Sequence, residues 1–192
     1  WDWNTGIYVL GPNASVGYPY FGANFWQDWE RPLHIEFFEA DGTREVSIDA
    51  GTKIHGGWSR AEPQKSVRLI ARGGYGGDSI DHAFFDDVDN SSFKTLILRN
   101  SGNDFYFGNC RDPITHLASK GAGIDDMAYR PTVVYLNGEY WGLMGLRERQ
   151  DDEYLAYHHG VDPDRVDLLQ HNAVVIEGSD EHYQEMLDYL RS

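Results

Sequence analysis

The stretch that decides the fold is "RPTVVYLNGEYWGLMGLRER", residues 130–149. Two runs rich in β-branched and aromatic residues flank Asn137-Gly138, the dipeptide that best suits the tight turn of a two-residue β-hairpin. A second hairpin is predicted upstream, where "HIEFFEA" and "TREVSID" alternate apolar and polar residues around Asp41-Gly42. Together the two hairpins predict a mostly antiparallel sheet.

Further strands and helices follow from local patterns. "KSVRLIAR" (65–72) alternates with period two, and "FKTLILRN" (93–100) is a run typical of a buried strand. Shorter strands are expected at 6–10 and in "HNAVVIEG". Helices are predicted in three places: from Asp112 as N-cap to Gly121, over 151–159, and from Ser179 as N-cap to the end of the sequence. The predicted fold class is α+β, a mostly antiparallel sheet with flanking helices.

The chain of 192 residues fits a single domain, with residues 1–31 as a loop-rich N-terminal extension and 32–192 as its body. It begins at Trp1 without a methionine, and its last helical pattern runs to Ser192 without a C-cap. We therefore expect it to be a piece of a longer protein.

Composition excludes several functional classes. The formal net charge of −15 disfavours a general binder of nucleic acids or anionic membranes, because the average field repels polyanions. No apolar run approaches the length of a membrane-spanning helix. Cys110 is the one cysteine, which rules out an intrachain disulfide and a cysteine-built zinc site. An acidic chain with many tryptophans and tyrosines favours an extracellular or cell-envelope location.

Basic residues are concentrated in one segment of this acidic chain. Residues 53–72, "KIHGGWSRAEPQKSVRLIAR", hold five of the 16 lysines and arginines but one of the 31 acidic residues. Basic side chains two apart on a strand project from the same face, and Gly56-Gly57 lets backbone amides approach a ligand. Phosphate is the ligand that such a segment best suits, because arginine and lysine bind its oxygens through charge-assisted hydrogen bonds. The alternative is an edge strand whose charges deter aggregation.

Other patterns are weaker. No GxxxxGK[ST] sequence is present, so the glycines do not indicate a P-loop. Two acidic clusters could offer oxygen ligands to calcium, although solvated loops are the commoner use of such clusters and neither matches an EF-hand. Their members are Asp86, Asp87, Asp89 and Asn90 in one and Asp162, Asp164 and Asp167 in the other. Glu148, between two arginines, could hold a cation of the basic strand or a ribose hydroxyl, or form a surface ion pair.

Four phrases in sequence order resemble the CotH-like family, spore-coat and secreted proteins with an atypical protein-kinase-like fold. The resemblance covers about residues 32–190. The phrases are "DAGTKIHGGWSRAEPQKSVRLIAR", "FKTLILRNSGNDFYFGNCRDPITHLA", "RPTVVYLNGEYWGLMGLRERQDDEYLAYHHGVDPDRVDLL" and "VVIEGSDEHYQEMLDYL".

This resemblance implies binding of ATP with magnesium or manganese, and phosphoryl transfer to Ser or Thr of a protein substrate. It makes Lys65 and Arg68 the candidates for phosphate contacts, and it implies that Arg99, Asp104 and Glu148 orient the nucleotide-binding half. No catalytic or metal-binding residue is assigned in this chain, because the family's catalytic and metal-binding aspartates would follow Ser192. The chain is thus expected to be the ATP-binding front portion of a kinase, inactive alone and able to dimerise through an exposed face.

Two other functions stay open from sequence. The first is a non-catalytic extracellular module that binds glycans or proteins, with Trp58, Tyr140 and Trp141 stacking on sugars. The second is a scaffold that keeps the family's shape without its catalysis.

Overall fold

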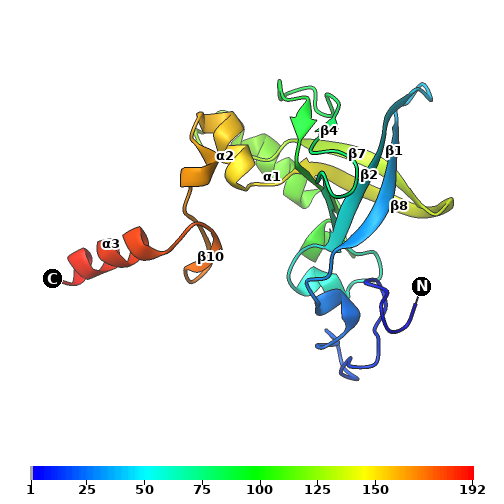
Figure 1. Ribbon diagram of the computed structural model, residues 1–192, viewed down its shortest axis with the longest axis horizontal. Coiled ribbons are helices and arrows are strands. Elements are labelled where there is room, and N and C mark those ends of the chain that lie inside the picture. The colour runs from blue at the N-terminus through cyan, green and yellow to red at the C-terminus, as the bar shows by residue number, and fades with distance from the viewer. Residues whose placement is uncertain (1) are drawn as a thin grey trace. The chain divides into compact units, whose positions relative to one another are not determined.

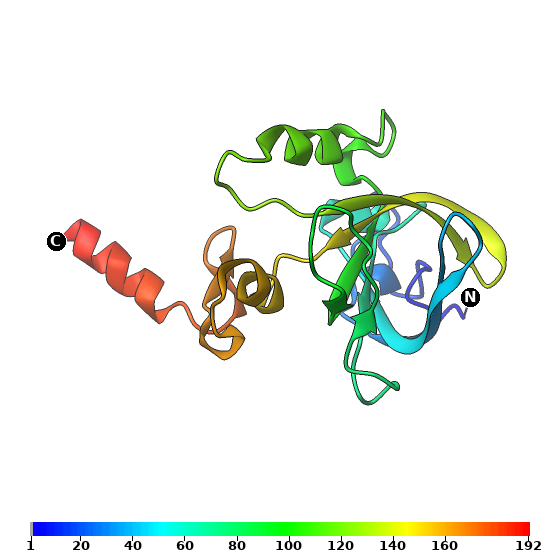
Figure 2. The same ribbon diagram turned by 90° about the horizontal axis from the view of Figure 1, so that it is seen from above.

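The computed structural model describes residues 2–192 and divides into two compact units, one ending at Glu148 and the other spanning Arg149–Ser192 (Figures 1 and 2). The first contains the main sheet, and the second contains two helices and a small two-stranded sheet. The expectation of one domain over 1–192 stays a prediction.

A six-stranded antiparallel sheet forms the first unit, in the order β1-β2-β3-β6-β8-β7. The sheet is curled, as Figure 2 shows. The α+β class with a mostly antiparallel sheet is therefore confirmed. Its strands are β1 (Arg31–Phe38), β2 (Arg44–Ile54), β3 (Val67–Ile70), β6 (Thr95–Arg99), β7 (Tyr129–Leu136) and β8 (Glu139–Glu148). A separate short pair is made by β4 (Ile80–Asp81) and β5 (Ser92–Phe93).

Both predicted hairpins are confirmed. β7 and β8 meet at Asn137 and Gly138, whose φ angles of 52° and 81° are the left-handed values that a type I′ turn requires. β1 and β2 pair around Asp41-Gly42, where the Asp41 carboxylate accepts the Thr43 backbone N–H. Turn chemistry thus decides the register of both hairpins.

The main core lies on one face of this sheet. Leu69 of β3, Leu96 of β6 and Leu146 of β8 point into it, and the loop after β4 contributes Phe84 and Phe85. β3 lies between β2 and β6, so the interpretation of the basic segment as an edge strand is wrong.

Residues 2–30 cover a second, smaller core and contain one short 3₁₀ helix, η1 (Asn24–Trp26). Ala23 and Phe25 pack there against Ile54 and Ala61. The strand predicted at 6–10 does not form, because the chain turns at Gly6, whose N–H donates to the Asp2 carbonyl oxygen.

Two short 3₁₀ helices and one α-helix gather near the end of β6. They are η2 (Trp58–Ala61), η3 (Gly102–Asp104) and α1 (Arg111–Ser119). α1 was predicted, but its N-cap is Cys110 and not Asp112. The backbone N–H groups of Cys110 and Arg111 both donate to Oδ2 of Asp104, at 3.0 Å. Because Asp104 satisfies these donors from outside the helix, Asp112 is free to face the sheet.

The second unit confirms two predicted helices and one predicted strand. Its elements are α2 (Asp152–His159), η4 (Pro163–Arg165), β9 (Leu168–Gln170), β10 (Val174–Glu177) and α3 (Glu181–Arg191). Gly160 ends α2 with a φ of 67°, as its position after the helical pattern predicted. The predicted N-cap of α3 is wrong by one residue: Asp180 occupies it, and the Ser179 N–H donates to Asp167. No helix within residues 2–192 is long and apolar enough to cross a membrane.

Shortening a core side chain should lower the free energy of unfolding far more than shortening an exposed side chain of the same sheet. We expect Leu96→Ala to lower the free energy of unfolding by about 2–5 kcal/mol, because Leu96 is 1% exposed and its loss leaves a cavity. The same substitution at Leu143, 58% exposed on β8, should cost about 0.5 kcal/mol or less. Urea denaturation of both variants measures the difference, and equal losses would contradict this placement of the core.

Candidate functional site: an arginine pair on one carboxylate

Two arginines lie on the same face of adjacent central strands. Arg147 of β8 is directly opposite Ile97 of β6, and Arg99 of β6 is two residues further along. Residues two apart on a strand share a face, so Arg99 and Arg147 are diagonal neighbours.

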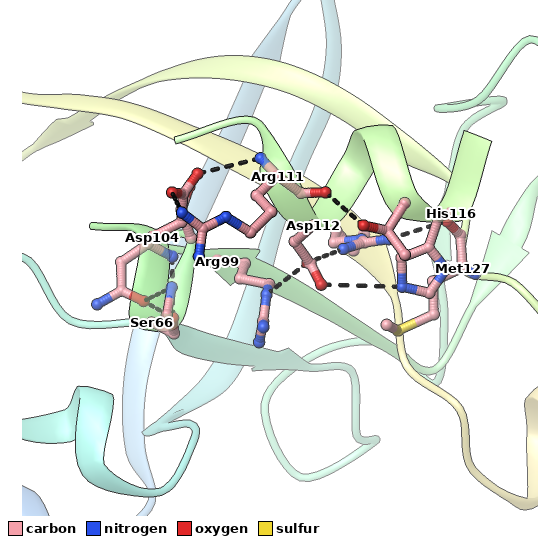
Figure 3. A network of polar contacts seen from close by, with 12 residues as sticks. Ser66, Arg99, Asp104, Arg111, Asp112, His116 and Met127 are labelled. Atoms are coloured by element: carbon pink, nitrogen blue, oxygen red, sulfur yellow. Dashed lines mark hydrogen bonds and ion pairs between the residues drawn. The ribbon is translucent and has the colours of Figure 1, made fainter. Parts of the chain in front are cut away.

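A single carboxylate from α1 joins them. Oδ2 of Asp112 accepts from Nε of Arg99 at 2.8 Å and also from Nη1 of Arg147. Figure 3 shows Arg99 beside Asp112, with His116 further along the same helix. Two positive charges therefore share one negative charge, and the group carries a net charge of about +1.

The two guanidinium groups differ in their access to solvent. Arg147 is 1% exposed, its Nη2 donates to the Met127 carbonyl oxygen at 3.2 Å, and burial lowers its pKa. The side chain of Arg99 is 31% exposed, and within residues 2–192 its terminal Nη groups donate to no protein acceptor. Arg99 thus presents two charged donors that a ligand could use.

A shallow hollow lies beside this pair. Gly102 borders the Arg99 guanidinium so closely that a side chain there would start 3.2 Å from Nη2. The hollow is lined by Arg99, Ser101, Asp112, Pro113, Tyr129, Gly145 and Arg147. Its donors are charged or hydroxylic, which suits a small anion.

A buried polar network places the loop at the edge of the hollow. Asn100 is 2% exposed, its N–H donates to Oγ of Ser66, and that hydroxyl donates back to Asn100 Oδ1 at 2.8 Å. Its Nδ2 donates to the Gln64 carbonyl oxygen at 2.7 Å. The loop after Arg99 is therefore pinned to the segment before β3.

α1 is attached to the sheet through polar contacts, since none of its residues is buried. The Met127 N–H donates to Nδ1 of His116 at 3.3 Å, and Nε2 of His116 lies 3.9 Å from Oδ1 of Asp112. Burial, and next to it the charge of Arg147, lowers the pKa of His116. A neutral His116 thus supports the helix without adding a third positive charge to the pair.

Of the residues implied by resemblance, Asp104 acts from outside the hollow. Its carboxylate caps α1, and the Arg111 N–H is the main cause of its lowered pKa. Glu148 is buried, and its Oε2 accepts the Ala128 N–H at 3.1 Å. Both therefore position backbone around the site, while their roles toward nucleotide stay predictions.

Lys65 lies apart from this hollow and is 4% exposed. Its Nζ donates to the carbonyl oxygens of Arg60 and Glu62, both at 2.8 Å, and lies 3.9 Å from the centre of the Phe25 ring. Burial lowers the pKa of Lys65 to about 8, against the opposing effect of the Glu62 charge. The amine is held among carbonyl groups and rings, and a phosphate contact from it stays a prediction.

Carboxylates of the N-terminal segment pair with two of the five cations of the basic segment. Lys53 pairs with Asp28, at 2.9 Å, and Arg72 pairs with Glu30, at 3.1 Å. The pKa of Asp28 is lowered by its hydrogen bond from Lys53 and, more weakly, by the charge of Arg68. Lys53 and Arg72 thus pair with carboxylates of this chain, and the phosphate role of Arg68 stays a prediction.

Sequence reasoning missed Arg147 and the role of Asp112. The signal for Arg147 was present: the register imposed by Asn137-Gly138 places it among buried residues of β8. No local pattern could show that Asp112 would meet it, because the two residues are 35 positions apart.

Neither acidic cluster gathers into a metal site. Nowhere within the described residues do three His, Cys, Asp or Glu side chains form a group that could hold a metal ion. Asp162 instead caps η4, and Asp167 accepts from Ser179 and His182. Asp87 pairs with Lys120.

Comparison with models of protein families shows which family the chain belongs to. The family model described as CotH kinase protein matches residues 52–190. This chain belongs to the CotH kinase family. The matched range includes both arginines of the pair, Asp112 and every residue that the resemblance implied. A search of curated proteins found no match.

In this CotH-family chain, the buried amine should make stability depend on pH. Lys65 has a folded pKa of about 8 and an ordinary value of 10.5, so between these pH values the unfolded state binds more protons. The free energy of unfolding should therefore rise with pH across this window. Denaturation of wild type and Lys65→Met at pH 7–10 measures the difference, and a constant difference would contradict the placement of the amine.

The shared carboxylate should matter far more than a surface one. We expect Asp112→Asn to lower the free energy of unfolding by roughly 3 kcal/mol, because it leaves the buried Arg147 charge uncompensated. Asp87→Asn, which breaks an exposed pair with Lys120, should cost about 0–1 kcal/mol. Hydrogen exchange should also speed up across α1 in the first variant and not in the second.

Proposed function

We propose that the unit ending at Glu148 is the nucleotide-binding part of a CotH-type protein kinase and that Arg99, held by the carboxylate it shares with Arg147, binds phosphate oxygens of ATP. The observation that carries this proposal is the shared Asp112 carboxylate, which brings Arg99 and Arg147 together. Membership of a kinase family supplies the nucleotide as the natural source of phosphate.

The pairing of strand and helix supports a phosphate role. Protein kinases hold a strand cation in place with a carboxylate from the helix beside the sheet, and that cation contacts the nucleotide phosphates. Here Arg99 of β6 and Asp112 of α1 have this relation. Arginine suits the task because its planar fork can bind two phosphate oxygens at once.

The residues fit the two parts of a metal–nucleotide complex differently. Phosphate fits the hollow, since Arg99 has charged donors available and Tyr129 and Ser101 line the same wall. A magnesium or manganese ion does not fit in the same way, because the described residues offer no group of three suitable side chains. We therefore derive no step through a metal.

The reaction we propose for the family chain is phosphoryl transfer to Ser or Thr of a protein outside the cell or in its envelope. The resemblance assigns no base and no metal-binding aspartate to residues 1–192, so the 192-residue chain should bind nucleotide without transferring phosphate. Incubation with γ-labelled ATP, magnesium and casein should leave the acceptor unlabelled. Saturable labelling by the purified chain would overturn this part of the proposal.

Substitution of Arg99 tests the binding site itself. We expect Arg99→Ala to weaken ATP binding about tenfold or more in calorimetry, because it removes a charge-assisted pair of hydrogen bonds. Arg44→Ala is the matched control, since Arg44 makes only a half-exposed pair with Glu36 on the β1–β2 hairpin. Circular dichroism checks that both variants fold. Equal affinities of the two variants would contradict the site.

A further inference from the structure

A second feature of the first unit lies outside the arginine pair: a cluster of exposed aromatic side chains. Tyr18 and Phe21 come from the N-terminal segment, Trp58 opens η2, and Tyr106 follows η3. Each is more than half exposed. Aromatic surface of this kind is typical of binding sites.

The rings are in contact across the sequence. The Trp58 ring centre lies 6.3 Å from that of Tyr18 and 5.9 Å from that of Phe21. Phe21 in turn packs on Trp26, at 5.0 Å, and the Trp26 Nε1 donates to the Pro19 carbonyl oxygen. Trp26, which is held by its hydrogen bond to Pro19, thus supports the Phe21 ring of the cluster.

A buried carboxylate organises the phenol groups at the centre of the cluster. Glu62 is 8% exposed, and its Oε1 accepts from the Tyr18 hydroxyl at 3.1 Å. The same carboxylate is the main cause of the raised pKa of Tyr106. The Tyr18 hydroxyl therefore binds this carboxylate, and the Tyr106 hydroxyl lies close enough for the carboxylate to raise its pKa, so polar edges border the apolar ring faces.

The backbone under the cluster is strained. Tyr20 packs on Tyr18 at 6.1 Å and has a φ of 60°, a left-handed value that is rare for a bulky side chain. Such strain persists only where the surroundings hold it, and it concentrates at functional sites.

We propose that the cluster of Tyr18, Phe21, Trp58 and Tyr106 around Glu62 is a binding site for a soluble oligosaccharide. A sugar ring has apolar C–H faces that stack on aromatic rings and a rim of hydroxyl groups that both donate and accept hydrogen bonds. Ring faces bordered by phenols and a carboxylate match both properties.

The angles between the rings narrow the ligand further. Trp58 is tilted by 44° from Tyr18 and by 79° from Phe21, so the cluster is not a flat surface. A flat crystalline polysaccharide needs coplanar rings, whereas a single free chain can follow a twisted set.

The other aromatic residues predicted to stack on sugars do not join this site. Trp141 packs edge-on against Tyr8, at 5.1 Å, and its Nε1 donates to the Tyr8 hydroxyl. Tyr140 pairs with Tyr135 on the β7–β8 hairpin. The proposed saccharide site uses no residue of the arginine pair. Its test is therefore independent of the test of nucleotide binding.

Calorimetry with the full 192-residue chain tests the proposal. The probes are the hexasaccharides of cellulose, chitin, xylan and mannan, and at least one should bind with a measurable heat. Trp58→Ala should weaken that binding about tenfold or more, because it removes the central ring face. Tyr140→Ala is the matched control, since Tyr140 is equally exposed on the same unit, and it should bind as the wild type does.

Further outcomes are decisive in either direction. Loss of binding in Trp58→Ala with an unchanged melting temperature supports the site, because a structural role would lower both. Absence of binding to all four hexasaccharides overturns it, and so does equal weakening by the two substitutions. A third outcome also overturns the saccharide site: the wild-type chain binds a protein partner, Trp58→Ala does not, and neither binds a saccharide. That result would identify the cluster as a protein interface.

Discussion

The structure depends on one carboxylate shared by two guanidinium groups. α1 has no buried residue, so apolar packing cannot hold it on the sheet. Asp112 connects it at once to β6 through Arg99 and to β8 through Arg147. Because Arg147 is almost wholly buried, loss of its counter-charge would leave an uncompensated charge in the interior. The position of the helix and the shape of the hollow therefore follow from the same contact.

Charge is arranged differently in two neighbouring parts of the first unit. In the basic segment, Lys53 and Arg72 pair with Asp28 and Glu30, and the Lys65 amine is held by backbone carbonyl oxygens. Beside α1, two cations share one anion, and Arg99 keeps donors directed toward solvent. An excess of positive charge next to a hollow is what a phosphate needs, and this favours the arginine pair over the basic segment that is prominent in the sequence.

The proposed nucleotide and saccharide sites are linked through Asn100. Asn100 follows Arg99 in the sequence, and its side chain donates to the carbonyl oxygen of Ser59, which follows Trp58. The family membership of the chain is compatible with both sites, since each uses a different set of side chains.

Local patterns determined most of the fold. Asn137-Gly138 and Asp41-Gly42 were sufficient for the two hairpins, and alternation was sufficient for β3, because turn geometry and side-chain period are properties of neighbouring residues. The candidate site was only half visible: Arg99 was identified, whereas Arg147 and Asp112 were not. Whether a cation meets a distant carboxylate, a carbonyl group or solvent depends on strand order and helix placement, and only the tertiary structure decides these.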